Sequence, residues 1–352
     1  MTPRLTLGTA GHVDHGKTRL VGALTGTDTD RLEEERRRGI SIVLGYAELA
    51  LPDGARLSVV DVPGHERFVR TMVGGATGID LALLCVAADD GVMPQTTEHL
   101  AILALLGVAH GVVAITKADL ADDARIAAVA GDVRAALRGS PLADAPIVPV
   151  SAATGSGLDE LVARIADEAA RTAPRPASGR VRLPVDRAFA LKGIGTVATG
   201  TLWSGTLRVG DRIEVQPGGA SARVRSLEVH GGPVDDAPAG SRVAAALVGV
   251  ERDEAPPGSV LWTGPPARTS YRLDVEAACL ADTGGLAHGE HLEVLHGTAL
   301  AHARAVVLGA DAVPAGGRGL VQLRLDAPLA ALRGDRVVLR RLAPPGTVAG
   351  RD

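Results

Sequence analysis

A glycine-rich loop near the start of the chain has the residue types and spacing that hold phosphate groups. The loop follows a short apolar run and fits the pattern G-x4-G-K-[ST], in which backbone N–H groups wrap the phosphates. Lys17 is expected to reach the β- and γ-phosphates, and the Thr18 hydroxyl to bind Mg²⁺. The residues expected to form this phosphate loop are Gly11, His12, Val13, Asp14, His15, Gly16, Lys17 and Thr18.

Two short segments add groups that respond to a γ-phosphate. Asp61 ends an apolar run and is expected to hold Mg²⁺ through water, while the N–H of Gly64 senses the γ-phosphate. His65 follows directly and is expected to orient the attacking water, with an ordinary surface histidine as the alternative. Ser41 is expected as a second Mg²⁺ ligand, placed after a charged run, 33–38, that has the pattern of a solvated helical face.

A third group of residues is suited to a guanine base. The Asp119 carboxylate can accept both guanine N1–H and N2–H, and adenine offers no such pair of donors. The stem of Lys117 is expected to cover the base, and backbone N–H groups near Ser151 to complete the pocket. The residues expected at the base are Thr116, Lys117, Asp119, Leu120, Ser151 and Ala152. Together the motifs predict binding of GTP and GDP with Mg²⁺.

The elements that must position these residues differ between the two halves of the chain. Residues 1–170 alternate apolar runs with amphipathic stretches, which predicts a mainly parallel sheet with helices on both faces. After a Pro/Ala/Ser-rich segment the pattern becomes short alternating runs separated by Gly and Pro, which predicts all-β domains with barrel-like spacing. The expected division is a P-loop GTPase domain over 1–172, a linker over 173–180, and β-barrel domains over 181–266 and 267–352.

Composition excludes several classes of protein. Hydrophobic residues make up 46% and charged residues 22% of the 352, so wholesale disorder is excluded. No apolar run approaches the roughly 20 residues of a membrane helix, and the start lacks a signal-peptide core. Cys85 and Cys279 lie far apart in apolar runs and are expected to be buried thiols in a cytoplasmic protein. The three lysines are Lys17, Lys117 and Lys192, so two of them fall in the nucleotide motifs.

The motifs GHVDHGKT, RGISI, DVPGHERFV and TKAD resemble those of the translational GTPases related to elongation factor Tu. The likeness continues through VDRAFALKGIGTVATGTLWSG and HLEVLHGTALAHARAVVLG. Within that group the chain is most similar to the selenocysteine-specific elongation factors. Three features distinguish the chain from general tRNA carriers. They are Thr116 in place of the usual Asn, the segment DVPGHERFV, and the dipeptide Asp186-Arg187.

The resemblance implies a carrier that brings selenocysteinyl-tRNA to the ribosome at recoded UGA codons and hydrolyses GTP there. The positions that match the family's aminoacyl pocket are Asp186, Arg187, His230 and Arg242, with ordinary surface or ion-paired arginines as the alternative for Arg187 and Arg242. A selenol is largely ionised at neutral pH, so arginines beside it favour selenolate over the neutral serine hydroxyl. Val13 and Ile40 match the family's apolar gate in front of His65. We also expect a monomer with no membrane partner.

Three positions depart from the family pattern. Ser41 stands where Thr is usual, Val43 stands where Asp is common, and the sequence ends at Asp352. We therefore expect recognition of an mRNA hairpin to need a C-terminal region that this sequence does not contain. The alternatives are a regulatory GTPase subunit of a metabolic enzyme of the sulfate-adenylylation type, another tRNA-carrying translational GTPase, or a module that binds guanine nucleotide without turnover.

Overall fold

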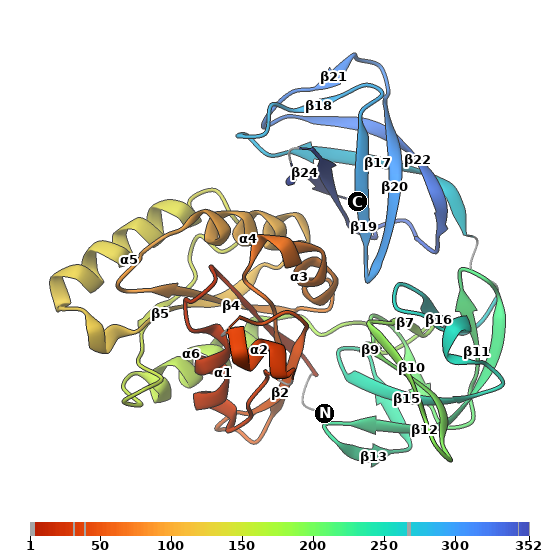
Figure 1. The fold of residues 1–352 in the computed structure, drawn as a ribbon, viewed down its shortest axis with the longest axis horizontal. Coiled ribbons are helices and arrows are strands. Elements are labelled where there is room, and N and C mark those ends of the chain that lie inside the picture. The colour runs from red at the N-terminus through yellow and green to blue at the C-terminus, as the bar shows by residue number, and fades with distance from the viewer. Residues whose placement is uncertain (1–3, 31, 39, 266–268, 344, 352) are drawn as a thin grey trace. The chain divides into compact units, whose positions relative to one another are not determined.

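The chain folds into two compact units, Met1–Pro174 and Arg175–Asp352. Figure 1 colours the chain from red at its start to blue at its end. The computed structural model describes residues 4–30, 32–38, 40–265, 269–343 and 345–351.

The first unit is a six-stranded sheet with helices on both faces (Figure 1). Its strand order is β2-β3-β1-β4-β5-β6, and every neighbouring pair is parallel except β2 with β3. The strands are β1 Thr6–Ala10, β2 Gly45–Ala50, β3 Arg56–Asp61, β4 Leu81–Ala87, β5 His110–Thr116 and β6 Ile147–Pro149. The α-helices are α1 Lys17–Thr25, α2 Glu33–Arg38, α3 Val69–Ala76, α4 Pro94–Leu105, α5 Asp123–Leu137 and α6 Leu158–Arg171.

The central strands are apolar without alternation because helices cover both of their faces. All seven residues of β4 are buried. On one face, Leu20 and Val21 of α1 share a core with Leu161 and Ile165 of α6. Within the described residues, none of the helices has the length and apolar character needed to cross a membrane.

The sheet gathers the predicted motifs at one edge. The phosphate loop follows β1, the Asp61–Gly64 segment closes β3, the Thr116–Leu120 segment follows β5, and the Ser151 loop follows β6. Because these four strands are parallel, their carboxyl ends meet at the same edge of the sheet. The fold thus brings segments more than a hundred residues apart in sequence to one place.

The second unit begins with an antiparallel sheet in the order β7-β16-β11-β12-β15-β9-β8, with β13 paired to β12. A separate ribbon pairs β10 with β14. Its strands are β7 Arg182–Pro184, β8 Arg187–Leu191, β9 Gly195–Thr201, β10 Thr206–Arg208, β11 Arg212–Gln216, β12 Ala220–Val229, β13 Gly232–Val234, β14 Asp236–Pro238, β15 Arg242–Val248 and β16 Val260–Trp262. Hydrogen bonds do not join β7 to β8 among the described strands, so this sheet has two edges.

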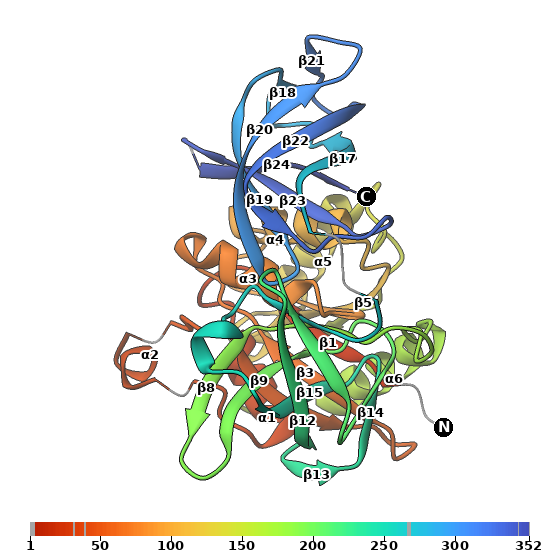
Figure 2. The same cartoon turned by 90° about the vertical axis from the view of Figure 1, so that its right-hand side faces the viewer.

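The strands that follow close into a barrel in the order β17-β22-β20-β19-β23-β24, drawn in cyan to blue in Figure 2. A short ribbon pairs β18 with β21. The strands are β17 Ser270–Cys279, β18 Leu286–Ala287, β19 His291–His296, β20 Ala299–Val307, β21 Ala312–Val313, β22 Arg318–Leu329, β23 Val337–Leu342 and β24 Pro345–Arg351. The predicted fold class, a mainly parallel α/β domain followed by β-barrel domains, is confirmed, although among the described strands hydrogen bonds close the barrel only in the second β domain.

The expected linker, 173–180, carries no helix or strand, yet it is not a loose tether. The backbone N–H of Gly205 donates to the Pro176 carbonyl at 2.9 Å. The Thr206 hydroxyl donates to the Ala177 carbonyl at 2.8 Å. These bonds hold the segment against the first β domain.

A buried ion pair joins the two β domains of the second unit. Arg182 of β7 donates from Nη1 to Oδ1 of Asp335 at 2.8 Å and from Nη2 to Oδ2 at 2.5 Å. Nε2 of His296 lies 2.9 Å from the same Oδ2, and the guanidinium carbon of Arg182 lies 5.1 Å from the ring centroid of Trp203. Burial opposes ionisation of Asp335, but the hydrogen bonds from His296 and Arg182 outweigh it and hold its pKa well below the usual range.

Candidate nucleotide site

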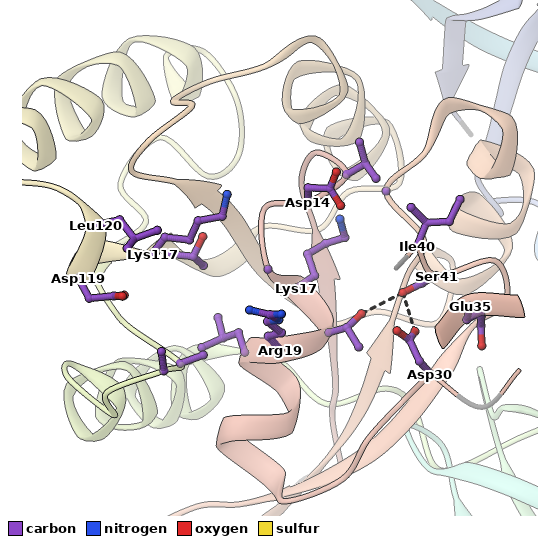
Figure 3. A pocket seen from close by; sticks show the side chains of 18 residues that line it. Asp14, Lys17, Arg19, Asp30, Glu35, Ile40, Ser41, Lys117, Asp119 and Leu120 are labelled. Atoms are coloured by element: carbon purple, nitrogen blue, oxygen red, sulfur yellow. Dashed lines mark hydrogen bonds between the residues drawn. The ribbon is translucent and has the colours of Figure 1, made fainter. Parts of the chain in front are cut away.

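A pocket of about 590 Å³ opens at the sheet edge where the motif loops meet. Figure 3 shows Lys117, Asp119 and Leu120 at one end, Asp30, Glu35, Ile40 and Ser41 at the other, and Asp14 and Lys17 between them. The residues singled out in the sequence that line it are Val13, Asp14, Gly16, Lys17, Thr18, Ile40, Ser41, Gly64, Thr116, Lys117, Asp119, Leu120 and Ala152. Sequence reasoning missed Arg19, Leu20, Asp30, Glu35 and Ala153.

The phosphate loop has a backbone shape that only certain residues allow. Gly11 has φ +127°, and a Cβ there would lie 2.2 Å from the Cys85 carbonyl oxygen, so no side chain fits. Asp14 is left-handed, with φ +60°. Nζ of Lys17 lies inside the loop and donates to the carbonyls of Gly11 at 3.0 Å and His12 at 2.6 Å. Burial lowers the pKa of this ammonium group, and an anion in the pocket would offset that effect.

Two side chains of α4 hold the first half of the loop. Nδ1 of His99 accepts the N–H of Gly11 at 3.0 Å, and Oε1 of Gln95 accepts the N–H of Val13 at 3.0 Å. His99 has no exposed surface, and burial lowers its pKa to about 3. The ring is therefore neutral at physiological pH, which leaves Nδ1 free to accept. No local pattern marks these two residues, because their partners lie more than eighty residues away.

We expect acid to weaken the first unit through His99. Below its unfolded pKa of about 6.5 the histidine gains a proton on unfolding but stays neutral when folded, so stability falls as pH falls. At about pH 5 the loss from this residue is about 2 kcal/mol. His99→Asn keeps an acceptor that does not titrate and should flatten this part of the pH dependence. Urea unfolding at each pH, followed by the helical signal in circular dichroism, measures the free energy of unfolding of this unit, because α1–α6 lie in it.

A slope unchanged in His99→Asn would contradict this assignment. Asp122→Asn serves as a control, because it changes a helix cap at the surface of the same unit, where Asp122 accepts the N–H of Arg125 at 2.8 Å. Its pH dependence between about pH 7 and about pH 5 should follow that of the unmodified chain.

The residues expected to bind Mg²⁺ form one hydrogen-bonded cluster. Thr18 Oγ1 donates to Oδ2 of Asp61 at 2.7 Å and lies 2.9 Å from Oγ of Ser41. Ser41 donates to Oδ1 of Asp30 at 2.9 Å, and burial raises the pKa of that carboxyl. Thr29 also donates to Asp61, at 2.7 Å. Hydroxyl and carboxylate oxygens are the donors that Mg²⁺ prefers, so the residues present fit this ion.

The end of the pocket lined by the predicted guanine motif is joined to the phosphate loop by one hydroxyl. Thr116 Oγ1 is buried and donates to the His15 carbonyl at 2.8 Å, which joins the end of β5 to the phosphate loop. Lys117 is left-handed, with φ +55°, and its Nζ lies 2.9 Å from Oδ2 of Asp89. The turn Ala118–Leu120 that follows carries Asp119 into the pocket.

Ser151 does not line the pocket but shapes the loop that does. Its hydroxyl accepts the N–H groups of Ala153 at 3.3 Å and Thr154 at 3.1 Å. Ala152 and Ala153 are thereby presented to the pocket. Asp61 likewise lies behind the lining and acts on it through Thr18.

His65 lies next to the pocket and not in its lining. It begins the turn Glu66–Phe68, its Nδ1 accepts the N–H of Arg67 at 3.2 Å, and its ring centroid lies 5.9 Å from that of Phe68. The adjoining Gly64 does line the pocket, and a Cβ there would lie 2.3 Å from Nζ of Lys17. Gly11, His12 and His15 also lie outside the lining.

The predicted aminoacyl residues lie in the second unit. Arg242 of β15 donates to both carboxylate oxygens of Asp186, at 2.6 and 3.0 Å, and the Thr199 hydroxyl donates to the same carboxylate at 2.7 Å. Arg187 begins β8 and pairs in register with Thr199. His230 is left-handed, with φ +53°, in the turn between β12 and β13. The structure thus brings Asp186 and Arg242 into direct contact, next to the strand that starts at Arg187.

Three family models match the chain. The elongation factor Tu GTP-binding domain matches residues 2–171, elongation factor Tu domain 2 matches residues 195–262, and the β-barrel domain of the selenocysteine-specific elongation factor matches residues 272–352. The selenocysteine-specific elongation factor of Desulfomicrobium baculatum is 48% identical over 98% of this chain. The chain spans 54% of that relative, about half its length.

Solved structures agree with the sequence relatives. A crystal structure of a bacterial selenocysteine-specific elongation factor has a TM-score of 0.91 at 33% identity, over 100% of this chain and 58% of that one. The apo form of translation elongation factor SelB from Methanococcus maripaludis has a TM-score of 0.82 at 30% identity, over 99% of this chain and 79% of that one. The same protein has been solved with the GTP analogue GppNHp. On these matches, the chain belongs to the selenocysteine-specific elongation factors, within the elongation-factor-Tu-like translational GTPases.

Proposed function

We propose that this chain binds GTP with Mg²⁺, carries selenocysteinyl-tRNA to the ribosome at recoded UGA codons, and hydrolyses GTP to GDP when the ribosome activates it. The observation that carries the proposal is one pocket lined by the phosphate loop, the Ser41 segment and the guanine motif. The match of residues 272–352 to the selenocysteine-specific barrel supports the choice of cargo.

Within the pocket, Lys17 neutralises the phosphates and Asp119 selects guanine. Thr18, Ser41 and Asp61 would hold Mg²⁺, which when bound would supply positive charge beside the phosphates. His65 orients the attacking water once activated. Its position beside the pocket is compatible with this role, because catalytic contacts commonly tighten only in the reacting complex.

The aminoacyl group is proposed to meet Asp186, Arg187, His230 and Arg242. Two carboxylate contacts fix the guanidinium plane of Arg242, so its orientation does not depend on the cargo. A selenolate then receives charge-assisted hydrogen bonds from the arginines, whereas a neutral serine hydroxyl receives only weaker ones.

A regulatory GTPase subunit of a metabolic enzyme would have the same nucleotide motifs, so these motifs do not distinguish it from a tRNA carrier. A regulatory subunit of the sulfate-adenylylation type has no need for the selenocysteine-specific barrel that residues 272–352 match. We therefore favour the tRNA carrier. We further propose that the domain boundaries lie near residues 172, 180 and 266.

The first test compares two cargoes on one tRNA. We expect the GTP-bound chain to bind selenocysteinyl-tRNA at least about tenfold more tightly than the same tRNA charged with serine. A charge-assisted hydrogen bond contributes about 1.5–3 kcal/mol, and about 1.4 kcal/mol is a factor of ten in affinity. Equilibrium binding with fluorescently labelled tRNA measures both constants.

Substitution in the second unit locates the discrimination. Arg187→Gln should bring the two affinities together, while Arg223→Gln should leave their ratio unchanged. Arg223 is the matched control because it is an exposed arginine of the same sheet, on β12. Equal, weak binding of both cargoes by the unmodified chain would overturn the proposed cargo and leave a GTPase with another partner.

A further inference from the structure

Glu35 is a buried carboxylate in a run of charged residues. The run Glu33–Arg38 forms α2, as the sequence predicts, but it is not a uniformly solvated face. Glu33 and Glu34 are exposed, whereas only 1% of Glu35 is exposed. Carboxylates are rarely buried to this degree unless hydrogen bonds compensate for the loss of water.

Backbone N–H groups on both sides of α2 supply that compensation. Oε2 of Glu35 accepts the N–H of Leu32 at 2.9 Å, just before the helix, which is half of a capping box. Oε1 accepts the N–H of Ile42 at 2.9 Å and the N–H of Val43 at 3.0 Å, well after the helix. One side chain therefore ties the segment that follows α2 back to the start of the helix.

The segment held in this way carries the hydroxyl expected to bind Mg²⁺. Ser41 directly precedes Ile42, and its Oγ lies 2.9 Å from Oγ1 of Thr18. Glu35 and Ser41 both line the nucleotide pocket, and Figure 3 shows them at the same end of it. Fixing the backbone at Ile42 keeps the Cα of Ser41 near Thr18, and the contacts of its hydroxyl with Thr18 and Asp30 orient the side chain.

We propose that Glu35 is a positioning residue that latches the 40–43 segment in the arrangement where Ser41 reaches the Mg²⁺ ion of a bound triphosphate. The inference rests on the nucleotide and Mg²⁺ part of the proposed function, and it is independent of the tRNA cargo. A γ-phosphate and its metal use the Ser41 hydroxyl, whereas a diphosphate does not require it. The latch accordingly supports GTP and contributes little to GDP.

The expected effect is a selective loss of triphosphate affinity. In Glu35→Ala the N–H groups of Leu32, Ile42 and Val43 lose their acceptor, so the segment moves toward water and Ser41 leaves Thr18. We expect affinity for GTPγS with Mg²⁺ to fall by about 10- to 100-fold, the effect of one or two charge-assisted hydrogen bonds. Affinity for GDP should stay within about threefold.

The experiment measures dissociation constants for fluorescent GDP and GTPγS, each titrated with Mg²⁺, in four proteins. These are the unmodified chain, Glu35→Ala, Glu35→Gln and Glu33→Gln. Glu33→Gln is the matched control, because it removes the same charge from an exposed position of the same helix. Glu35→Gln keeps one oxygen acceptor, so its loss of GTPγS affinity should be intermediate.

Each outcome decides between the latch and a simpler role. Equal losses for GDP and GTPγS in Glu35→Gln would show a role in folding alone and overturn the proposal. If Glu35→Ala fails to fold, the affinities of Glu35→Gln and amide hydrogen exchange at Ile42 and Val43 decide between the latch and a role in folding alone. Exchange there should be slower with GTPγS than with GDP in the unmodified chain, and equal rates would contradict the latch. Failure of the unmodified chain to bind either nucleotide would instead reject the proposed function.

Discussion

His65→Ala should leave GTP affinity within about twofold and lower ribosome-stimulated hydrolysis by about 10²- to 10⁴-fold, the contribution of a group that handles a proton or orients water. Binding is expected to survive because the His65 side chain does not line the pocket. Turnover is expected to collapse because the adjoining Gly64 does line the pocket beside Lys17, so the chain brings His65 to the end proposed to hold the γ-phosphate. Single-turnover release of phosphate with ribosomes measures the rate.

The matched control is Glu66→Ala, an exposed neighbour in the same turn, which should keep the rate of the unmodified chain. His65→Gln keeps a hydrogen-bonding group but does not titrate near neutral pH. A partial rate in that variant would indicate orientation of the water more than proton transfer. An unchanged rate in His65→Ala would remove His65 from its assigned role.

Arg182→Met should destabilise the second unit by about 3–5 kcal/mol, since the buried carboxylate of Asp335 loses both bonds to the guanidinium and keeps only its contacts with His296 and the N–H of Leu332. The side chains of Arg182 and Asp335 are only 10% and 11% exposed. Urea unfolding followed by tryptophan fluorescence is a local probe, because the only two tryptophans, Trp203 and Trp262, both lie against Arg182, at 5.1 and 5.7 Å.

An exposed ion pair in the same unit provides the comparison. Nη2 of Arg252 lies 2.9 Å from Oδ1 of Asp253, and the two side chains are 60% and 84% exposed. Arg252→Met should therefore lower the free energy of unfolding by less than about 1 kcal/mol. Because the folded pKa of Asp335 is depressed, its contribution is present above the unfolded pKa of about 4 and is lost as pH falls below it. Similar losses in Arg182→Met and Arg252→Met would contradict the importance of burial.

Much of the fold could be predicted from local pattern. Unbroken apolar runs such as the one in β4 indicate buried parallel strands, and the alternating runs after residue 180 indicate antiparallel sheets. The nucleotide motifs are themselves local, because a loop that wraps phosphates needs its residues in one short stretch. Their arrival at one sheet edge then follows from the parallel order of the strands.

The residues that were missed depend on distant partners. Glu35 lies among other glutamates, and what distinguishes it is its hydrogen bonds with the backbone of Leu32, Ile42 and Val43. His99 acquires its role from Gly11, and Arg182 from Asp335, which is 153 residues away in the chain. Sequence periodicity indicates which face of a helix or strand is buried, but it does not indicate which residue that face contacts.

The scarcity of lysine makes the pocket chemically addressable. Apart from the terminal amine, the chain offers three primary amines, on Lys17, Lys117 and Lys192. The phosphate loop encloses the amine of Lys17. Lys117 lines the pocket, is partly exposed and pairs with Asp89. Lys192 is exposed in the hairpin between β8 and β9. In labelling with an amine-reactive reagent, the extent of reaction at Lys117 should therefore report occupancy of the proposed base site, with Lys192 in the other unit as the internal standard.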